Sequence, residues 1–440
     1  MFRLPLPKTA SAPFCPSEVR GSVAVPPGLP FWRKALRSAG PGLLVAVGYM
    51  DPGNWATDIE AGSRYGYDLL FVIGLCGFGA MLLQWLAMRL GLVTGRDLGR
   101  MARERYAPAT VKCLWLLAEL AIVATDIAEV LGSALAFNLL LGVPLWLGVL
   151  LTGLDTVIVL GLKGQGFRQV EAIVLGLVAT IALCFAVQLA IAVPSPAGIL
   201  HGLVPRPAIF ADPHALYLAV GILGATVMPH NLYLHSSVVQ TRLVGSGEPA
   251  KRDAIRFATI DIVVALLLAT LVNGAILTLS AATFHASGFS GVAEIEDAYR
   301  LLAPITGASA AAALFAIALF ASGQSATFTG TIAGQVILEG FLDLKIPCWQ
   351  RRLITRGLAL VPALAGVMWL GDHAVGKLLV LTQVVLSLQL PFAIWPLIRF
   401  TSDRALMGAF ATPRLLAGAA WAMFATIVTA NLWLIGRWFA

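Results

Sequence analysis

The chain has 440 residues, of which 58% are hydrophobic and only 12% are charged, and its formal net charge is +7. Soluble proteins carry about 25% charged residues, so this composition excludes a water-soluble globular protein. Nearly charge-free stretches recur along the chain, and a helix needs ~20 apolar residues to cross a bilayer. The sequence also lacks the alternation of apolar and polar residues that a membrane β-barrel requires. We therefore predict an all-α, polytopic membrane protein.

The chain divides into an N-terminal tail and a membrane domain. Residues 1–38 are rich in Pro and basic residues but lack the compact apolar core of a signal peptide. We expect residues 1–38 to form a loosely ordered cytoplasmic tail and residues 39–440 to form a transmembrane domain. Eleven apolar segments follow the tail, with the approximate ranges 41–58, 69–93, 112–140, 143–162, 170–193, 214–240, 257–284, 308–338, 355–371, 376–399 and 414–436.

The basic residues are distributed unevenly between the two sides that these segments define. If the N-terminus lies inside, 25 of the 30 Lys and Arg residues fall on the inner side. The outer side holds only Arg64, Arg206, Arg300, Lys377 and Arg437. The positive-inside rule then predicts the N-terminus inside and the C-terminus outside. The positive net charge is thus a topology signal, and we expect no nucleic-acid partner.

The first and sixth segments are interrupted in the same way. The first contains "DPGN" at residues 51–54, and the sixth contains "MPH" at residues 228–230. Proline removes a backbone donor and disfavours helix at the preceding residue, so we predict that both helices are unwound near mid-membrane. The two lie five segments apart and therefore run in opposite directions. This pattern is typical of two inverted five-helix repeats with a substrate site at the midplane, plus here an eleventh helix.

The two interruptions and segment ten present a mixed set of donor atoms. The candidates are the side chains of Asp51, Asn54, Met228 and Gln383 and the backbone carbonyls of Gly48 and Ala225. Hard oxygens with one soft sulfur suit a divalent transition metal, whereas an all-oxygen cage suits calcium or magnesium. A methionine taken alone is usually a core residue. Beside a proline break and opposite Asp51, we favour Met228 as a ligand.

A second group of polar residues lies on the third segment. Glu119, Asp126 and Glu129 are spaced at i, i+7 and i+10, broadly on one side of a helix. Intramembrane acids usually mark ion or proton pathways, and His230 adds a group that titrates near physiological pH. The remaining candidates for this pathway are Asp51, Arg351 and Arg352. For each acid taken alone, a structural ion pair between helices stays an equal alternative, and the row of three favours a proton route.

A coupling mechanism follows as a hypothesis. A desolvated Asp51 would hold a proton, and a divalent ion would favour the carboxylate and expel that proton. The acids of segment three and His230 would then relay it. Elsewhere, we expect His235 to be an interior hydrogen-bonding histidine rather than a ligand. We expect Gln84 and Asn273 to be interhelical hydrogen-bond partners, with a gating role as the alternative.

Four motifs resemble those of the Nramp family (natural resistance-associated macrophage proteins). They are "DPGN" at 51–54, "MPH" at 228–230, "GQSATFTGTIAGQVILEGF" at 323–341 and "RRLITR" at 351–356. The resemblance covers about residues 40–435, and the bacterial manganese-transport branch is the most similar. It implies a LeuT-like fold and proton-coupled import of Mn²⁺, with Fe²⁺ and Cd²⁺ also accepted. It also implies that the metal candidates are ligands and that the acids, His230 and the arginines belong to the proton route.

Two positions depart from the family pattern. Gly48 stands where alanine is common, and we expect this to loosen the first break. Asp155 has no counterpart in the family pattern, and the sequence assigns it no role. Relatives that handle magnesium or aluminium replace the methionine at position 228, so its presence here favours a transition metal.

Three rival functions are weighed against this interpretation. An organic-substrate symporter of the same fold would not require a carboxylate–thioether pair, and a passive channel would not require two broken helices. A membrane-embedded metalloenzyme using His230, His235 and Asp51 would require a tight histidine cluster. We therefore expect a secondary transporter, with no resident cofactor, that works as a monomer in the bacterial inner membrane. Its partners would be divalent metal ions, protons and the lipid bilayer.

Overall fold

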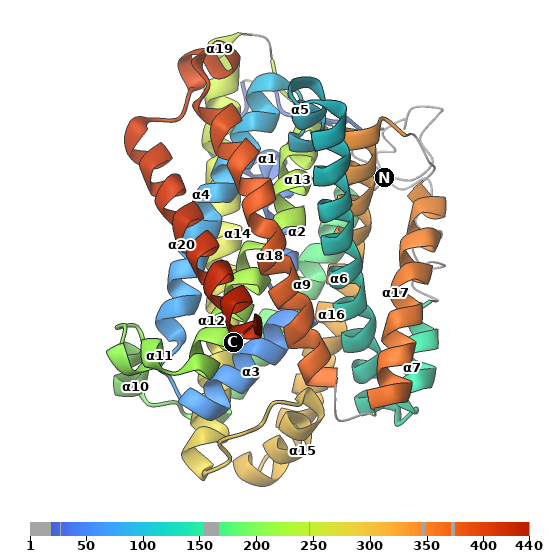
Figure 1. The fold of residues 1–440 in the computed structure, drawn as a ribbon, viewed down its shortest axis with the longest axis vertical. Coiled ribbons are helices and arrows are strands. Elements are labelled where there is room, and N and C mark those ends of the chain that lie inside the picture. Colours follow the sequence, from blue (N-terminus) through green and yellow to red (C-terminus); the bar gives the residue numbers. More distant parts are fainter. Residues whose placement is uncertain are drawn as a thin grey trace.

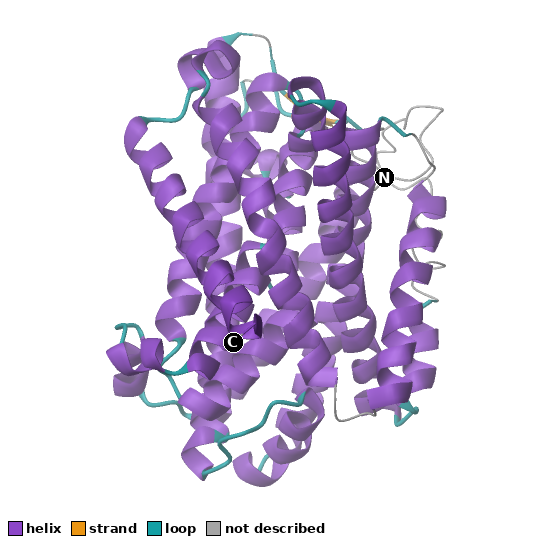
Figure 2. Cartoon of the chain, in the orientation of Figure 1, coloured by secondary structure: helices purple, strands orange, loops and turns teal. Residues whose placement is uncertain are grey.

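The computed structural model describes residues 19–26, 28–153, 167–245, 247–344, 348–370 and 375–439. Within these ranges, the side chains of residues 348, 349, 351–353, 370, 438 and 439 are not described. Nearly all of the described chain is helical (Figure 2). The long helices lie side by side along the long axis of the molecule (Figure 1). This confirms the predicted all-α architecture.

The helices fall into two halves that follow one another in the chain. The first half contains α2 (Pro41–Gly48), α3 (Pro52–Tyr65), α4 (Leu70–Thr94), α6 (Pro108–Leu141), α7 (Leu145–Thr152) and α9 (Phe167–Ala192). The second half contains α12 (Pro213–Val227), α13 (Pro229–Val238), α14 (Glu248–Thr283), α16 (Ser309–Leu342), α17 (Cys348–Leu370) and α18 (Val375–Ser402). The last helix, α20 (Arg414–Phe439), follows both halves. Each half begins with a broken helix, α2–α3 or α12–α13, as the sequence predicts.

Short elements connect the long helices at the two ends of the bundle. The short helices are α1 (Phe31–Ser38), α5 (Leu98–Arg105), α10 (Pro196–Gly202), α11 (Pro207–Ala211), α15 (Ile295–Thr306) and α19 (Arg404–Met407). The 3-10 helices are η1 (Val239–Thr241), η2 (His285–Ser287) and η4 (Gly408–Phe410). The helices α1, α5 and α19 lie toward one end, here called the α5 end, and α10, α11 and α15 lie toward the other, the α15 end (Figure 1). The positive-inside prediction assigns the α5 end to the cytoplasm.

Most of the predicted membrane segments are recognisable by length and hydropathy. Among the described residues, eight helices are long and apolar enough to cross a membrane. The first segment is not one of them because its break leaves pieces of 8 and 14 residues. The apolar part of α17, Ile354–Trp369, is shorter than a full span. Segment four is described only as far as the end of α7, and residues 154–166, which include Asp155, lie outside the described part of the chain.

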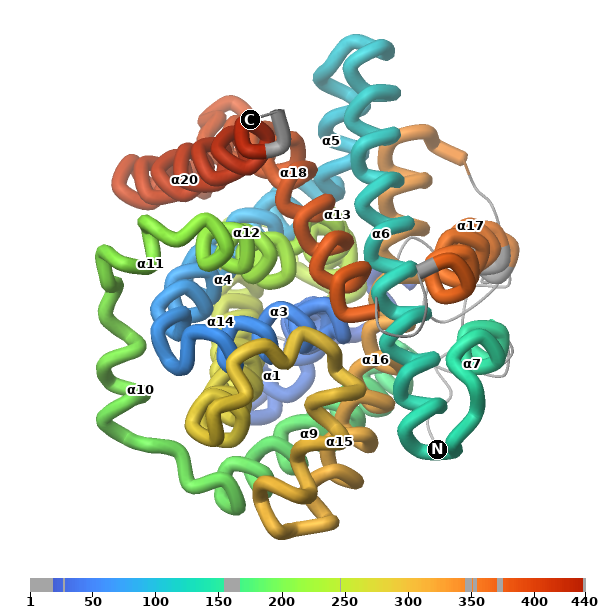
Figure 3. The backbone as a smooth tube through the Cα atoms, turned by 60° about the horizontal axis from the view of Figure 1, so that its bottom comes forward, coloured from blue at the N-terminus to red at the C-terminus, as the bar shows by residue number. Residues whose placement is uncertain are grey.

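Burial separates central helices from peripheral ones. The most apolar stretch of α12–α13 is 83% buried, whereas that of α20 is only 17% buried. In the oblique view of Figure 3, the peripheral helices are α20, α10, α11, α7 and α17. The broken helices therefore lie inside the bundle, and α20 stands outside both halves as the predicted eleventh helix.

Small residues bring α6 close to its neighbours. A Cβ atom on Gly323 of α16 would collide with the Ser133 hydroxyl of α6, and one on Gly330 would lie 2.7 Å from Glu129 Oε1. A Cβ atom on Gly132 of α6 would collide with the ring of Pro52 at the start of α3. Close approach at small residues is how membrane helices gain packing energy, because lipid offers no hydrophobic driving force. This packing fixes α6, with its acids, against the first break.

Part of the predicted tail has regular structure. Strand β1 (Val23–Ala24) pairs in parallel with β2 (Arg242–Leu243), and α1 follows it. The expectation of a loosely ordered segment is therefore wrong for Val23–Ala24 and Phe31–Ser38. The physical reason is tertiary contact, since a strand of two residues and a helix of eight are not stable alone in water.

Candidate metal-binding site

The first break, between α2 and α3, is held open by its own side chains. Pro52 has no amide N–H, so the helical bond to the Gly48 carbonyl is not formed. Asp51 caps α3, because its Oδ1 accepts a hydrogen bond of 2.9 Å from the Asn54 amide N–H. Asn54 Nδ2 donates to the Tyr49 carbonyl at 2.8 Å. Among the described residues, Asp51 Oδ2 and Asn54 Oδ1 have no hydrogen-bond partner, so one oxygen on each side chain is left to bind a ligand.

The second break, between α12 and α13, follows the same logic. Pro229 has no amide N–H, so the Ala225 carbonyl loses its helical partner. Met228 lies between the two helices with a non-helical backbone, φ 2° and ψ 113°. Its buried side chain packs against Ala121, Ala124 and Leu386. The two prolines thus free the two carbonyls that the sequence analysis named, at Gly48 and Ala225.

Asn231, on the first turn of α13, joins the two breaks. Its Nδ2 lies 3.4 Å from the Val45 carbonyl of α2 and 3.7 Å from Met228 Sδ. A Cβ atom on Gly48 would collide with this same amide. The expectation that Gly48 loosens the break is therefore wrong, because the missing side chain allows the Asn231 amide to approach the end of α2. Sequence reasoning assigned no role to Asn231, although it directly follows "MPH".

Gln383 of α18 lies between the same two helices. A Cβ atom on Gly53, in the first turn of α3, would collide with the Gln383 side-chain amide. A Cβ atom on Gly224, in the last turn of α12, would collide with the Gln383 carbonyl. Gln383 Oε1 has no hydrogen-bond partner among the described residues. Gln383 therefore packs against both broken helices.

The six predicted metal candidates share one environment. Asp51, Asn54, Met228, Gln383, Ala225 and Gly48 are all buried. Among the described residues, no group of three His, Cys, Asp or Glu side chains is placed to hold a metal ion. The donor set is therefore one carboxylate, two amide oxygens, one thioether and two carbonyls, which is the mixed hard and soft set that transition ions accept.

The proton-route candidates form a second group beside the second break. His230 Nδ1 lies 3.3 Å from Thr125 Oγ1, and Thr125 directly precedes Asp126 on α6. Asp126 and Glu129 are buried. Arg356 of α17 forms an ion pair of 3.8 Å with Glu129 Oε2, and both side chains are at most 5% exposed. These contacts connect α13 to α6 and α6 to α17.

Other predicted members of this route are less central or not described. Glu119 precedes Asp126 and Glu129 in α6, and its side chain is half-buried. The side chains of Arg351 and Arg352 lie outside the described residues. Arg356, which the sequence analysis did not assign, carries the described ion pair. Its position four residues after Arg352, on the same helix face, was the signal that could have found it.

Two further buried polar features surround the breaks. Gln84 Nε2 donates to the Tyr49 hydroxyl at 3.0 Å, and Gln84 Oε1 lies 3.1 Å from His235 Nδ1. This confirms the expectation of an interhelical hydrogen bond for Gln84 and of an interior hydrogen-bonding role for His235. Asp58 of α3 was missed, although it follows Asp51 by two helical turns in an apolar stretch. It is 1% exposed, and its Oδ2 has no partner among the described residues.

The α5 end of α2 is sealed by charged residues from α9, α14 and β2. Asp261 accepts hydrogen bonds from the amides of Gly40 (3.2 Å) and Gly42 (2.7 Å), at the start of α2. Arg242 donates to the Ser38 and Ala39 carbonyls. It also forms a buried ion pair of 2.6 Å with Glu171 Oε1. The segment that leads into α2 is therefore held by hydrogen bonds to α14 and β2 on the side where α5 lies, and these contacts are here called the seal.

The other end of the first broken helix is also tied to the second half. The Tyr65 hydroxyl at the end of α3 donates a hydrogen bond of 2.8 Å to Asp212, which caps α12. This hydrogen bond holds the pKa of Asp212 below its ordinary value. Glu60 of α3 lies 2.9 Å from His214 of α12. Contacts between the two halves thus exist on both sides of the candidate site.

Comparison with known proteins places this geometry in a family. The family model "Natural resistance-associated macrophage protein-like" (Nramp) matches residues 42–437. The divalent metal cation transporter MntH of Ralstonia nicotianae is 65% identical over 436 residues, which is 99% of each chain. A solved variant of the Eremococcus coleocola manganese transporter is 37% identical, with a TM-score of 0.89, over 96% of this chain and 90% of that chain.

A more distant structure bears on the fold alone. MhsT, solved with L-phenylalanine, has a TM-score of 0.56 at 14% identity, over 89% of this chain and 98% of that chain. This likeness confirms the LeuT-like fold with two inverted repeats and unwound first and sixth helices. Because the family model spans nearly the whole membrane domain, and close relatives align end to end, the chain belongs to the Nramp family.

Proposed function

We propose that this chain imports divalent transition-metal ions, Mn²⁺ and also Fe²⁺ and Cd²⁺, across the bacterial inner membrane by proton-coupled alternating access. The proposal rests on three side-chain oxygens, on Asp51, Asn54 and Gln383, that have no hydrogen-bond partner among the described residues. Asp51 and Asn54 belong to the first break, and Gln383 packs against both broken helices. The second break carries the buried Met228 thioether. The names of the relatives, a divalent metal cation transporter and a manganese transporter, support it.

The donor set explains why a transition metal is the expected substrate. Asp51 supplies the only negative charge among the six candidates, and the amide and backbone oxygens are neutral. Calcium and magnesium gain little from a thioether, whereas softer divalent ions bind it well. Met228 should therefore discriminate against the abundant hard ions, while the oxygens provide general affinity for divalent ions.

Proton coupling follows from the position of the acids. A divalent ion binds the ionised carboxylate and so displaces the proton that a buried, empty carboxylate would retain. His230 and Thr125 connect the second break to α6, and the Glu129–Arg356 pair continues toward α17. We propose that these groups carry the proton separately from the metal, toward the same side.

Alternating access requires that the seal at the α5 end opens. The hydrogen bonds of Arg242 and Asp261 to the start of α2 are the contacts that must break. The predicted topology assigns this end to the cytoplasm, so breaking them would release the metal inward. We expect the transporter to work as a monomer, without a resident cofactor.

An organic-substrate symporter is the second candidate, because the fold is shared with a protein solved with an amino acid. The carboxylate, thioether and freed carbonyls of this site favour a metal ion over an organic substrate. Competition of Mn²⁺ uptake by amino acids would favour the symporter instead.

The test of the proposed function is Mn²⁺ uptake by proteoliposomes that contain a pH-sensitive dye. We expect Mn²⁺ uptake to acidify the lumen and an inward proton gradient to accelerate it. Glu129→Gln should reduce proton movement more than Mn²⁺ binding, because Glu129 lies on the proposed proton route outside the donor set. Uptake without any proton movement would contradict the coupling, and the absence of Mn²⁺ uptake would contradict the transport itself.

A further inference from the structure

The short helix α1 has three distinct faces. Its apolar ridge consists of Trp32 and Leu36, which are 76% and 67% exposed. Beside it lies a basic ridge of Arg33 and Arg37, and among the described residues neither arginine is paired with a carboxylate. Residues at i and i+4 lie one above the other on a helix, so each ridge is continuous. An exposed apolar ridge next to a basic one is typical of helices that lie in a membrane interface.

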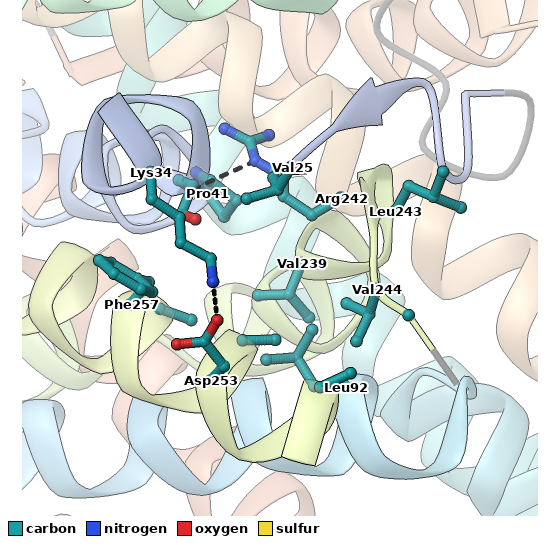
Figure 4. Close-up of a pocket in the computed structure, with 15 residues that line it drawn as sticks. Val25, Lys34, Pro41, Leu92, Val239, Arg242, Leu243, Val244, Asp253 and Phe257 are labelled. Atoms are coloured by element: carbon teal, nitrogen blue, oxygen red, sulfur yellow. Dashed lines mark hydrogen bonds and ion pairs between the residues drawn. The ribbon is translucent and has the colours of Figure 1, made fainter. Parts of the chain in front are cut away.

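The third face of α1 docks onto α14. Lys34 forms an ion pair with Asp253 (Figure 4), and the rings of Phe31 and Phe257 lie 5.4 Å apart. Beneath α1 is a cavity of about 350 Å³ lined largely by apolar side chains of η1, β2 and α14. These contacts fix the orientation of α1 about its own axis, so that Trp32 and Leu36 point away from the protein.

The position of α1 along α14 coincides with the edge of the lipid-facing surface. The exposed stripe of α14 consists of Arg252, Arg256, Ile260, Val263, Val264, Leu267 and Leu271. The stripe changes from basic to apolar between Arg256 and Ile260, which is where a helix enters the hydrocarbon region of a bilayer. The Arg256 guanidinium lies 5.9 Å from the ring of Phe31. Helix α1 therefore lies at the level of the interface itself.

We propose that α1 is an interfacial anchor that binds acidic phospholipids of the cytoplasmic leaflet. Trp32 and Leu36 insert among the acyl chains, and Arg33 and Arg37 bind the phosphate groups. Continuity with the apolar stripe of α14 favours lipid over a second copy of the chain or another protein. Arg33 and Arg37, which have no carboxylate partner in the described part of the chain, favour an acidic headgroup over a zwitterionic one.

The anchor is connected to the seal of the transport site. Arg168 donates to the carbonyls of Leu36 (2.8 Å) and Ala39 (2.6 Å). Arg242 holds the Ser38 carbonyl at 3.2 Å. The C-terminal carbonyls of α1 are thus bound by the residues that close the α5 end. Lipid binding would restrain the segment that leads into α2.

The test is a depth measurement on the full chain in vesicles. Leu36→Cys is labelled with an environment-sensitive fluorophore in a chain in which Cys15, Cys113 and Cys348 are replaced by serine. The two other cysteines, Cys76 and Cys184, are buried. Vesicles contain phosphatidylcholine and phosphatidylglycerol, and the acyl chains of one or the other lipid carry bromine. We expect strong quenching at position 36 and weaker quenching of the same label at Arg33→Cys.

The lipid preference is tested by removing the basic ridge. Phosphatidylglycerol should be enriched beside position 36 by roughly fivefold for each arginine at low salt. Its brominated form should therefore quench the label there more than brominated phosphatidylcholine. Arg33→Gln with Arg37→Gln should abolish the difference. The matched control, Arg105→Gln with Arg404→Gln, removes two exposed arginines at the same end of the molecule. This control should retain the difference in quenching between the two brominated lipids.

Three results would overturn the proposal. Quenching of position 36 by aqueous iodide but not by brominated lipid would place the ridge in water. Quenching that depends on the protein-to-lipid ratio would indicate a second copy as the occupant. Equal quenching by the two brominated lipids would exclude selection of acidic headgroups. The readout is the position of a label, so it does not depend on transport activity.

Discussion

Gly53 shows how the site depends on the absence of a side chain. It lies between Pro52 and Asn54 in the first turn of α3, and the Gln383 amide occupies the space where a Cβ atom would be. We expect Gly53→Ala to displace Gln383 and to weaken Mn²⁺ uptake by about tenfold or more, since overpacking costs about 1–3 kcal/mol. Initial uptake rates and the thermal midpoint in detergent measure the two effects.

The control is the same substitution where space is free. Gly176 of α9 is exposed, and a Cβ atom there would have no heavy atom within 4 Å. Gly176→Ala should leave uptake unchanged and slightly raise stability, because alanine favours helix by about 1 kcal/mol over glycine. Equal uptake by Gly53→Ala and wild type would contradict the packing of Gln383 against the break.

Most of the metal candidates could be predicted from the sequence, and their supporting residues could not. Asp51, Asn54 and Met228 stand within two residues of a proline inside apolar runs, where a polar or sulfur atom needs a local explanation. Asn231 and Arg356 act through partners on other helices, Val45 and Glu129. Such pairings depend on which helix faces meet, and a single sequence does not contain that information.

At the scale of elements, we propose that the seal on α2 controls access to the site from the α5 end. We expect Arg242→Gln to open the α5 end, because removing one partner of a buried ion pair costs about 3 kcal/mol. A cysteine placed at the buried Val45 should then react faster, by up to roughly a hundredfold, with a membrane-impermeant thiol reagent added from the cytoplasmic side. The measurement uses a chain whose accessible native cysteines are replaced by serine.

An exposed arginine at the same end provides the matched control. Arg252 pairs only with Glu248 among the described residues, and both are more than half exposed. Arg252→Gln should leave the reaction at position 45 unchanged. If Arg242→Gln gave no faster reaction than Arg252→Gln, the contacts to Ser38 and Ala39 would not be the seal.

The elements themselves were predictable to very different degrees. The two breaks followed from Pro52 and Pro229 together with the polar and flexible residues beside them. A proline alone does not decide, because Pro391 and Pro396 lie inside the continuous helix α18. The helical structure of α1 could not be predicted from the sequence, because a helix of eight residues is unstable alone. It forms through Lys34 with Asp253 and Phe31 with Phe257, which are contacts across more than 200 residues of sequence.

At the scale of the whole molecule, the fold is the repetition of one half in the opposite direction. Hydropathy predicted the apolar segments, eight of which are helices long enough to cross a membrane among the described residues, and the spacing of the breaks predicted the repeat. The close packing of α6 against α16 through Gly323 and Gly330 was not predicted. Glycines scattered along an apolar run do not reveal which neighbour they will face.

The central claim is that two broken helices from opposite halves jointly form a site for transition metals, with Met228 supplying the soft ligand. Selectivity tests it most directly, because only the thioether distinguishes Mn²⁺ from Ca²⁺ among these donors. Met228→Leu retains an apolar side chain of similar volume and removes the sulfur. Met88→Leu, in a separate buried cluster on α4, is the matched control.

The measurement is Mn²⁺ uptake by proteoliposomes in the presence of increasing Ca²⁺, for wild type and both variants. The account predicts that Met228→Leu still transports Mn²⁺ but loses about tenfold or more of its selectivity over Ca²⁺, whereas Met88→Leu behaves as wild type. Selectivity that is unchanged in Met228→Leu would contradict a metal site shared between the two breaks.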